Sequence, residues 1–153
     1  MVNKSRIWLG GLVGGLVWVI WGVLVNVFLI HQSRYDAAQA SGQFLKEPRF
    51  PFFFGWWILA ILILGISVAH LYAWSRATLG AGPGTAFKIG TLVGFAAGFP
   101  TNFGTATWAP ISRMFPLGWM IELWGGAILA TLIAGMIYKP MEAARSEDIR
   151  AAA

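Results

Sequence analysis

An apolar stretch without a single charge runs from Ile7 to Ile30, and it limits the possible folds of this chain more than any other feature. About 20 consecutive apolar residues in an α-helix cross the hydrocarbon core of a bilayer. A helix also pairs its own backbone N–H and C=O groups, as lipid requires. We interpret the stretch as a retained membrane span, because the apolar part of a cleaved signal peptide is shorter, roughly 7–15 residues.

The composition of the whole chain agrees with a membrane location. Of its 153 residues, 58% are hydrophobic and 11% are charged, whereas soluble domains carry roughly a quarter charged residues. Three further stretches are long enough to span, so the predicted spans are 7–30, 52–74, 85–108 and 117–138. The predicted fold is all-α: one membrane domain, residues 1–153, forming a four-helix transmembrane bundle.

The positions of lysine and arginine predict the orientation of the chain. With four spans, seven basic residues lie on the side of the two termini and four lie on the other side. The positive-inside rule then places both termini and the tail 139–153 in the cytoplasm, and the loop 31–51 in the periplasm. Within this loop, residues 35–44 are a candidate short surface helix. The basic residues are scattered over helix ends and short loops, so we expect them to meet the lipid bilayer and not nucleic acid.

Glycines four residues apart form stripes along one face of two predicted spans. Such a face lets a neighbouring helix backbone approach closely, which is how helices associate in lipid. The stripes serve either packing within the bundle or association with a second copy or a larger membrane complex, and the sequence leaves both open. The residues assigned to helix packing are Gly11, Gly15, Gly22, Gly90, Gly94, Gly98 and Gly126.

Glu122 is the acidic residue that falls inside a predicted span. A carboxylate at the bilayer centre costs about 3 kcal/mol even on the mildest insertion scale, so Glu122 must face other helices, reach the interface or be protonated. Gly125, Gly126 and Ala130 lie on its side of the helix, which predicts packing of that side against another span. Polar residues of similar depth, three of them beside Pro100, complete a candidate polar cluster: Glu122, Asn26, His31, Thr101, Asn102 and Thr105.

This cluster has two interpretations, and the sequence alone leaves both open. It is either a site for a small ligand, a proton or an ion, or a structural hydrogen-bonded centre that fixes the register of the helices. Motifs of enzymes are missing from the sequence, including the nucleophile elbow, the phosphate-binding loop and His-Glu-x-x-His. The chain has no cysteine, and its histidines and carboxylates lack metal-ligand spacing. We therefore predict no catalytic residue, no cofactor and no metal.

Four short stretches of the chain resemble a known group of proteins. They are the glycine-rich start of the first span from Trp8, residues 71–74, residues 82–86, and the segment from Glu122 to Tyr138. Together they look like a group of small, uncharacterised four-span proteins of the bacterial inner membrane. The resemblance implies four spans and a bacterial inner (cytoplasmic) membrane, and no assigned activity. Similar sequences often carry an acidic residue in the first span, where this chain has Asn26, and this departure argues against a pair of carboxylates.

The sequence thus favours a small structural or accessory integral membrane protein that is not an enzyme. It would act by self-association or as a subunit of a larger membrane complex. The alternative is a small transporter or an ion- or proton-conducting protein that uses the polar cluster around Glu122.

Overall fold

The computed structural model of the protein describes residues 2–140, and this part of the chain is helical, without strands. The all-α prediction is therefore confirmed. The predicted cytoplasmic tail lies, from residue 141 onward, outside the described residues. The elements are α1 (Lys4–Val25), a π-helical turn η1 (Asn26–Ile30), α2 (Gln32–Ala40), α3 (Phe53–Leu79), α4 (Pro83–Trp108) and α5 (Met114–Ile137).

Three segments are long and apolar enough to cross a membrane: Lys4–Ile30, Phe53–Leu79 and Met114–Ile137. Their presence points to a membrane protein. The helix α4 is of similar length but less apolar, because threonine, glycine, Pro100 and Asn102 interrupt its apolar residues. Of the four predicted spans, three thus meet this requirement.

The helix ends differ from the predicted spans by up to five residues. Helix α1 begins at Lys4, where the Asn3 side chain accepts a hydrogen bond from the backbone N–H of Arg6 at 3.2 Å, as a good N-cap does. Helix α3 continues beyond Trp74 to Leu79 and ends at Gly80, whose φ of 84° suits glycine. The loop 31–51 contains α2, which begins three residues before the expected surface helix.

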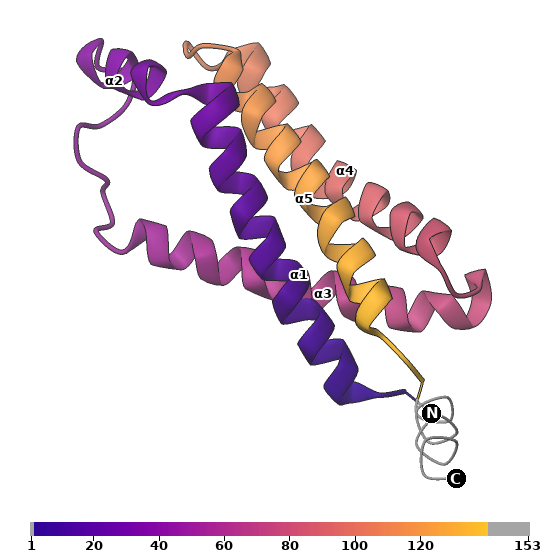
Figure 1. The fold of residues 1–153 in the computed structure, drawn as a ribbon. Helices are drawn as coiled ribbons and strands as arrows, with labels where there is room; N and C mark the ends of the chain where they lie inside the picture. Colours follow the sequence, from indigo (N-terminus) through magenta and orange to yellow (C-terminus); the bar gives the residue numbers. More distant parts are fainter. Residues whose placement is uncertain (1, 141–153) are drawn as a thin grey trace, which may run out of the picture.

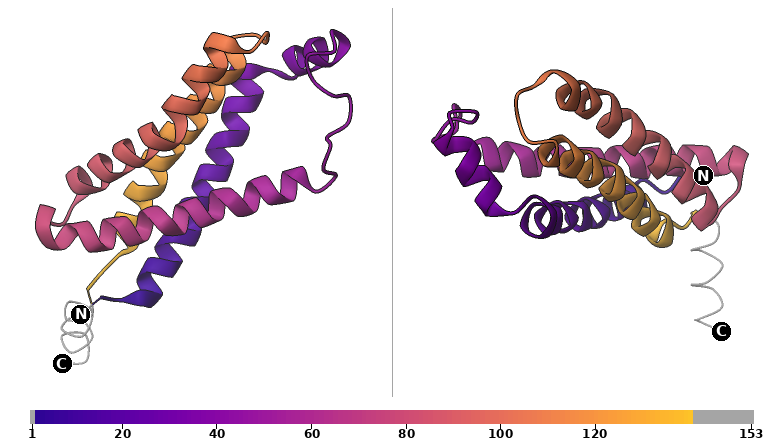
Figure 2. Two further views of the ribbon diagram at one scale, coloured as in Figure 1. Left: turned by 180° about the vertical axis from the view of Figure 1, so that it is seen from behind. Right: turned by 90° about the horizontal axis from the view of Figure 1, so that it is seen from above.

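Helix α5 lies between α1 and α4 and packs along both, whereas the backbones of α1 and α4 stay apart. Helix α3 crosses α1 obliquely, and its N-terminal part extends away from α4 and α5 (Figures 1 and 2). The short helix α2 lies at the same end of the molecule as the connection between α4 and α5 (Figure 1). At that end Ala38 of α2 and Phe115 of α5 share a small buried cluster with Ile30.

Glycines mark the place where α1 and α3 cross. A Cβ atom added to Gly65 would lie 2.5 Å from the Cα atom of Gly15, and one added to Gly11 would lie 2.6 Å from the Cα atom of Ile66. Real Cβ atoms do not approach a backbone so closely, so larger side chains would separate the two helices. The glycine stripe of α1, which contains Gly11 and Gly15, is therefore covered by α3.

The glycine stripe of α4, formed by Gly90, Gly94 and Gly98, is covered by α5. Added Cβ atoms would lie 2.6 Å from the Cα atom of Ile128 for Gly90 and 2.7 Å from the Cα atom of Trp124 for Gly94. At Gly98 the nearest atom is the backbone oxygen of Met120, 3.2 Å away. Both stripes thus serve contacts within one chain.

Helices α1 and α5 run antiparallel with a regular register of four residues. Gly10 lies against Ala134, Gly14 against Ala130, Trp18 against Gly126, and Gly22 against Glu122. At each level one of the two partners is a glycine. The large Trp18 side chain fits only because Gly126 has no side chain at all. This register carries Glu122 to the face of α5 that α1 covers.

Candidate functional site

The carboxylate of Glu122 lies where α1, α3 and α5 meet, and its side chain is only 4% exposed. Its Oε2 atom accepts a hydrogen bond from Nδ2 of Asn26 at 3.0 Å. Its Oε1 atom accepts one from the indole Nε1 of Trp57 in α3 at 3.1 Å. One side chain of α5 is thus bonded to two other elements, and both partners are uncharged.

The missing side chain of Gly22 makes room for this arrangement. A Cβ atom at Gly22 would lie 2.9 Å from the Trp57 ring and 3.3 Å from the carboxyl carbon of Glu122. The Trp57 indole therefore reaches the carboxylate across the bare backbone of α1. Gly22, expected to pack helices, here accommodates the side chains of the polar site.

Two tryptophans of α1 bind the backbone of α5 at the same level. The Nε1 atoms of Trp18 and Trp21 donate to the carbonyl oxygens of Glu122 and Ile121, each at 3.1 Å. The residues four positions later in α5 are Gly126 and Gly125, whose lack of a Cβ atom leaves space for the two indoles. Buried indole N–H groups need acceptors, and these carbonyls supply them without breaking the helix.

Asn26 connects Glu122 to the short helix α2. Its Nδ2 atom also donates to the backbone oxygen of Gly22 at 2.8 Å, and its Oδ1 atom accepts from the hydroxyl of Tyr35 at 2.7 Å. These bonds assign the orientation of the amide, with its nitrogen toward the carboxylate. The result is a continuous chain of hydrogen bonds from Tyr35 through Asn26 to Glu122.

Tyr35 is held in place by aromatic packing. Its ring centroid lies 4.9 Å from that of Phe115 in α5 and 6.1 Å from that of Phe44. Burial is the main cause that raises the pKa of the Tyr35 hydroxyl above its ordinary value, and the nearby Glu122 acts in the same direction. The hydroxyl therefore keeps its proton at neutral pH and donates it to Asn26.

The backbone between Asn26 and α2 is unusual. Residues Asn26–Ile30 form a π-helical turn, closed by a bond of 2.9 Å from the His31 N–H to the Asn26 oxygen. His31 then has a φ of 67° and is the residue other than glycine with positive φ in the described chain. π-Helical turns and such strained residues concentrate at functional sites, where the surrounding contacts hold them.

Of the predicted polar cluster, the structure brings only Asn26 into contact with Glu122. The exposed His31 shapes the backbone at the end of η1. Asn102 donates to the Gly98 oxygen of its own helix at 2.7 Å, and Thr105 donates to the Thr101 oxygen at 2.9 Å.

These α4 residues lie apart from the site because α4 and the site lie on different faces of α5. Helix α4 packs on the face of α5 that carries Met120, Trp124 and Ile128, whereas Glu122 points toward α1 and α3. Equal depth in a membrane does not place residues on the same side of a helix.

Four residues of the site were not among the predicted members: Trp57, Tyr35, Trp18 and Trp21. The pair Trp56-Trp57 has the sequence pattern of an interfacial aromatic belt, which conceals the role of the second indole. Trp18 did carry a signal, because an indole N–H in the middle of a span requires an acceptor.

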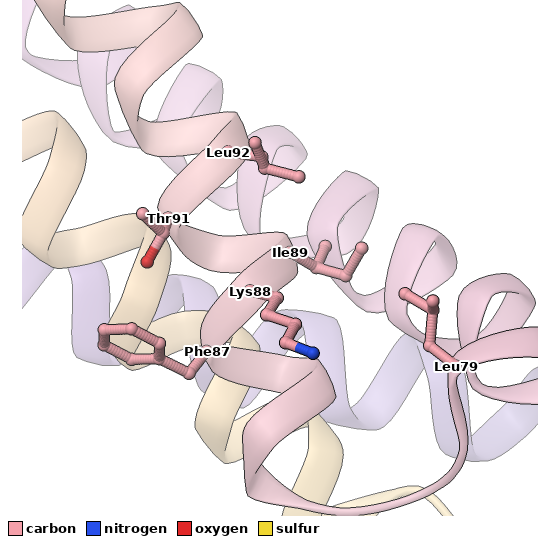
Figure 3. A pocket seen from close by; sticks show the side chains of 6 residues that line it. All are labelled: Leu79, Phe87, Lys88, Ile89, Thr91 and Leu92. Atoms are coloured by element: carbon pink, nitrogen blue, oxygen red, sulfur yellow. The ribbon is translucent and has the colours of Figure 1, made fainter.

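Residues 2–140 hold no group of three or more His, Cys, Asp or Glu side chains that could bind a metal ion. Two shallow hollows of about 320 Å³ each lie elsewhere on the surface. One is lined by the α3–α4 corner, where the Lys88 side chain and the apolar Leu79 and Leu92 surround it (Figure 3). The other lies at the start of α3, along Phe52, Trp56 and Leu59.

Fold and site together define a helical protein with apolar helices of membrane length and a buried carboxylate between them. No protein-family model, curated protein or solved structure matches the chain. The resemblance to small four-span bacterial proteins therefore stays a prediction.

Proposed function

We propose that the protein is a small, non-enzymatic structural or accessory protein of the bacterial inner membrane, with four spans and both termini in the cytoplasm. The observation that carries the proposal is the closed state of the polar site. Glu122 is 4% exposed, and neutral donors from α3 and η1 occupy both of its carboxylate oxygens. A transporter or proton channel that uses this carboxylate would need a continuous water-filled path past it to both sides of the membrane.

The packing of α4 supports the proposal that it also crosses the membrane, in addition to the three more apolar segments. Helix α4 follows α5 through its glycine face, and the hydroxyls of Thr105 and Thr107 donate to carbonyls of their own helix at 2.9 and 2.8 Å. Such bonds lower the cost of polar residues in lipid. The outward face carries Phe95, Phe99 and Phe103, stacked at 5.0 and 5.3 Å, which suits contact with acyl chains.

The four-span topology can be tested with single cysteines, because the chain has none of its own. We would introduce Ser41→Cys, Ala81→Cys and Ser112→Cys and label intact cells with a membrane-impermeant maleimide. Four spans expose positions 41 and 112 outside and hide 81 until the cells are permeabilised. If α4 does not cross, position 112 lies on the same side as position 81 and both stay unlabelled until the cells are permeabilised, which refutes the four-span proposal.

The accessory role is tested by extracting the tagged protein from its native membrane with a mild detergent. Because both glycine stripes are covered within the chain, a partner would meet outward surfaces such as the exposed start of α3, where Phe54 and Trp56 are 63% and 65% exposed. We expect either a defined oligomer or stoichiometric co-purification of other membrane proteins. A solitary monomer that conducts protons in liposomes would favour the conducting alternative instead.

A further inference from the structure

We propose that Glu122 is a reversible proton-binding site, and that its protonation loosens the attachment of α2 to the helices that cross the membrane. The inference goes beyond the accessory role and does not depend on any partner. It rests on the geometry of three connected side chains: Glu122, Asn26 and Tyr35.

The hydrogen bonds around Glu122 fit its ionised form. Trp57 can only donate, and the amide of Asn26 presents its NH₂ group to the carboxylate while its oxygen accepts from Tyr35. A proton on the carboxylate would add a further donor, and neither of these two groups presents an acceptor to it. The network is built for the anion.

A buried anion is nevertheless costly without a cation beside it. The titratable group that faces Glu122 is Tyr35 of α2, which is neutral. The basic side chains of the packed helices, such as Lys4 of α1, Arg76 of α3 and Lys88 of α4, belong to the opposite ends of those helices, and Arg34 and Arg113 near the α2 end are exposed. The charge of Glu122 is thus held by neutral hydrogen bonds, and proton uptake would remove it.

Proton uptake reverses the polarity of the chain of hydrogen bonds. When a proton binds the carboxylate, the new O–H group needs an acceptor, and rotation of the Asn26 amide would bring its oxygen to the place now held by its nitrogen, 3.0 Å from Oε2. That rotation breaks the bond of 2.8 Å from Asn26 to Gly22 and turns the Asn26 NH₂ group toward the Tyr35 hydroxyl. A charge-assisted bond is thereby replaced by neutral ones, which are about half as strong.

The backbone between η1 and α2 connects this change in hydrogen bonding to the position of α2. The π-helical turn and the positive φ of His31 persist because the contacts around them hold them. Asn26 begins this turn, and Tyr35 lies beyond it in α2. When the bonds on both sides of Asn26 weaken, the attachment of α2 depends mainly on its apolar contacts through Ala38 and the Tyr35 ring.

The test uses the full chain in lipid nanodiscs. Spin labels on Ser33→Cys in α2 and Ser112→Cys before α5 report the distance between these elements by pulsed electron paramagnetic resonance. Acidification from about pH 8 to about pH 4, across the range of carboxyl titration, should lower the ratio of attached to detached α2 about tenfold, the effect of losing one charge-assisted bond. In parallel, infrared difference spectra should show a carboxylic acid band that E122Q lacks.

Matched variants separate the proposal from a general effect of acid. Asp36→Asn removes an exposed acidic residue of α2 and should leave the response to pH intact. Tyr35→Phe removes the hydrogen bond from Tyr35 to Asn26 but keeps Glu122, so it should detach α2 at every pH while the infrared band remains. This variant tests the proposal even if E122Q does not fold. A distance distribution that ignores pH, or a wild type without the acid band, would overturn the proposal.

Discussion

The contact between Trp18 and Gly126 gives the sharpest test of the packing around the site. Trp18 is 0% exposed, and its indole lies directly on Gly126 while donating to the Glu122 carbonyl at 3.1 Å. A methyl group in Gly126→Ala would overlap the indole ring. Forced overpacking costs about 1–3 kcal/mol, and the loss of an interhelical hydrogen bond adds about 0.6 kcal/mol. We expect a loss of about 2–3 kcal/mol in the free energy of unfolding.

The assay is reversible unfolding in mixed micelles with increasing SDS, followed by circular dichroism. Gly104→Ala is the matched control, because it is the same change inside α4 and a Cβ atom there meets nothing within 4 Å. In the helix interior it should be neutral or stabilising, by up to about 1 kcal/mol. Equal stability of the two variants would refute the packing argument, as would a failure of Trp18→Leu to rescue Gly126→Ala in a double-mutant cycle.

Three further predictions concern the helix contacts and the site. Gly94→Leu should separate α4 from α5, because even a Cβ atom would lie 2.7 Å from the Trp124 Cα atom; cross-linking between cysteines placed on the two helices should fall sharply, whereas Leu92→Ala on the exposed face should leave it unchanged. Trp57→Phe keeps an aromatic side chain but removes the donor to Oε1 of Glu122, and SDS unfolding should show a loss of about 1.5–3 kcal/mol, the range for a hydrogen bond to a charged group; an unchanged midpoint would contradict the bond. Because burial raises the pKa of Tyr35, its contribution to stability is complete below the ordinary tyrosine pKa of about 10 and is lost as the pH rises through the raised value. Wild type should therefore lose stability above about pH 10 in excess of Tyr35→Phe, and parallel curves would show that the hydroxyl does not matter.

The sequence predicted the helices well because lipid restricts the backbone so strongly. Uncharged runs such as 7–30 have few alternatives to a helix, and the helix ends agree within a few residues. The predicted span 85–108, which corresponds to α4, is less apolar than the other three for a physical reason. Helix α4 exchanges apolar side chains for a glycine face, so the feature that packs it against α5 also lowers its hydropathy.

The partners of Glu122 were predicted less well, because depth along a span is easier to read than rotation about it. Asn26 lies at the right depth on the correct face of α1. Thr101, Asn102 and Thr105 also have similar depth, but α4 approaches α5 from the opposite side. Trp57 enters the site only because α3 crosses α1 obliquely, and no local sequence pattern specifies that crossing. Tyr35 depends in turn on a π-helical turn that apolar periodicity cannot reveal.

The position of the polar site follows from how the helices diverge. At Gly11, Gly15 and Gly65 the backbones of α1 and α3 touch, and from this crossing toward its N-terminus α3 moves away from the other helices. The residues of α3 that face α1 grow as the gap widens, from Gly65 through Ile61 to Trp57, two turns from the crossing. Apolar packing alone would have to fill this widening gap with ever larger side chains, whereas a carboxylate can bind donors from several elements at once. Glu122 therefore lies where close helix packing ends, and there it joins α5 to α3 and η1 through two hydrogen bonds, which is why we propose that its protonation loosens this end of the bundle.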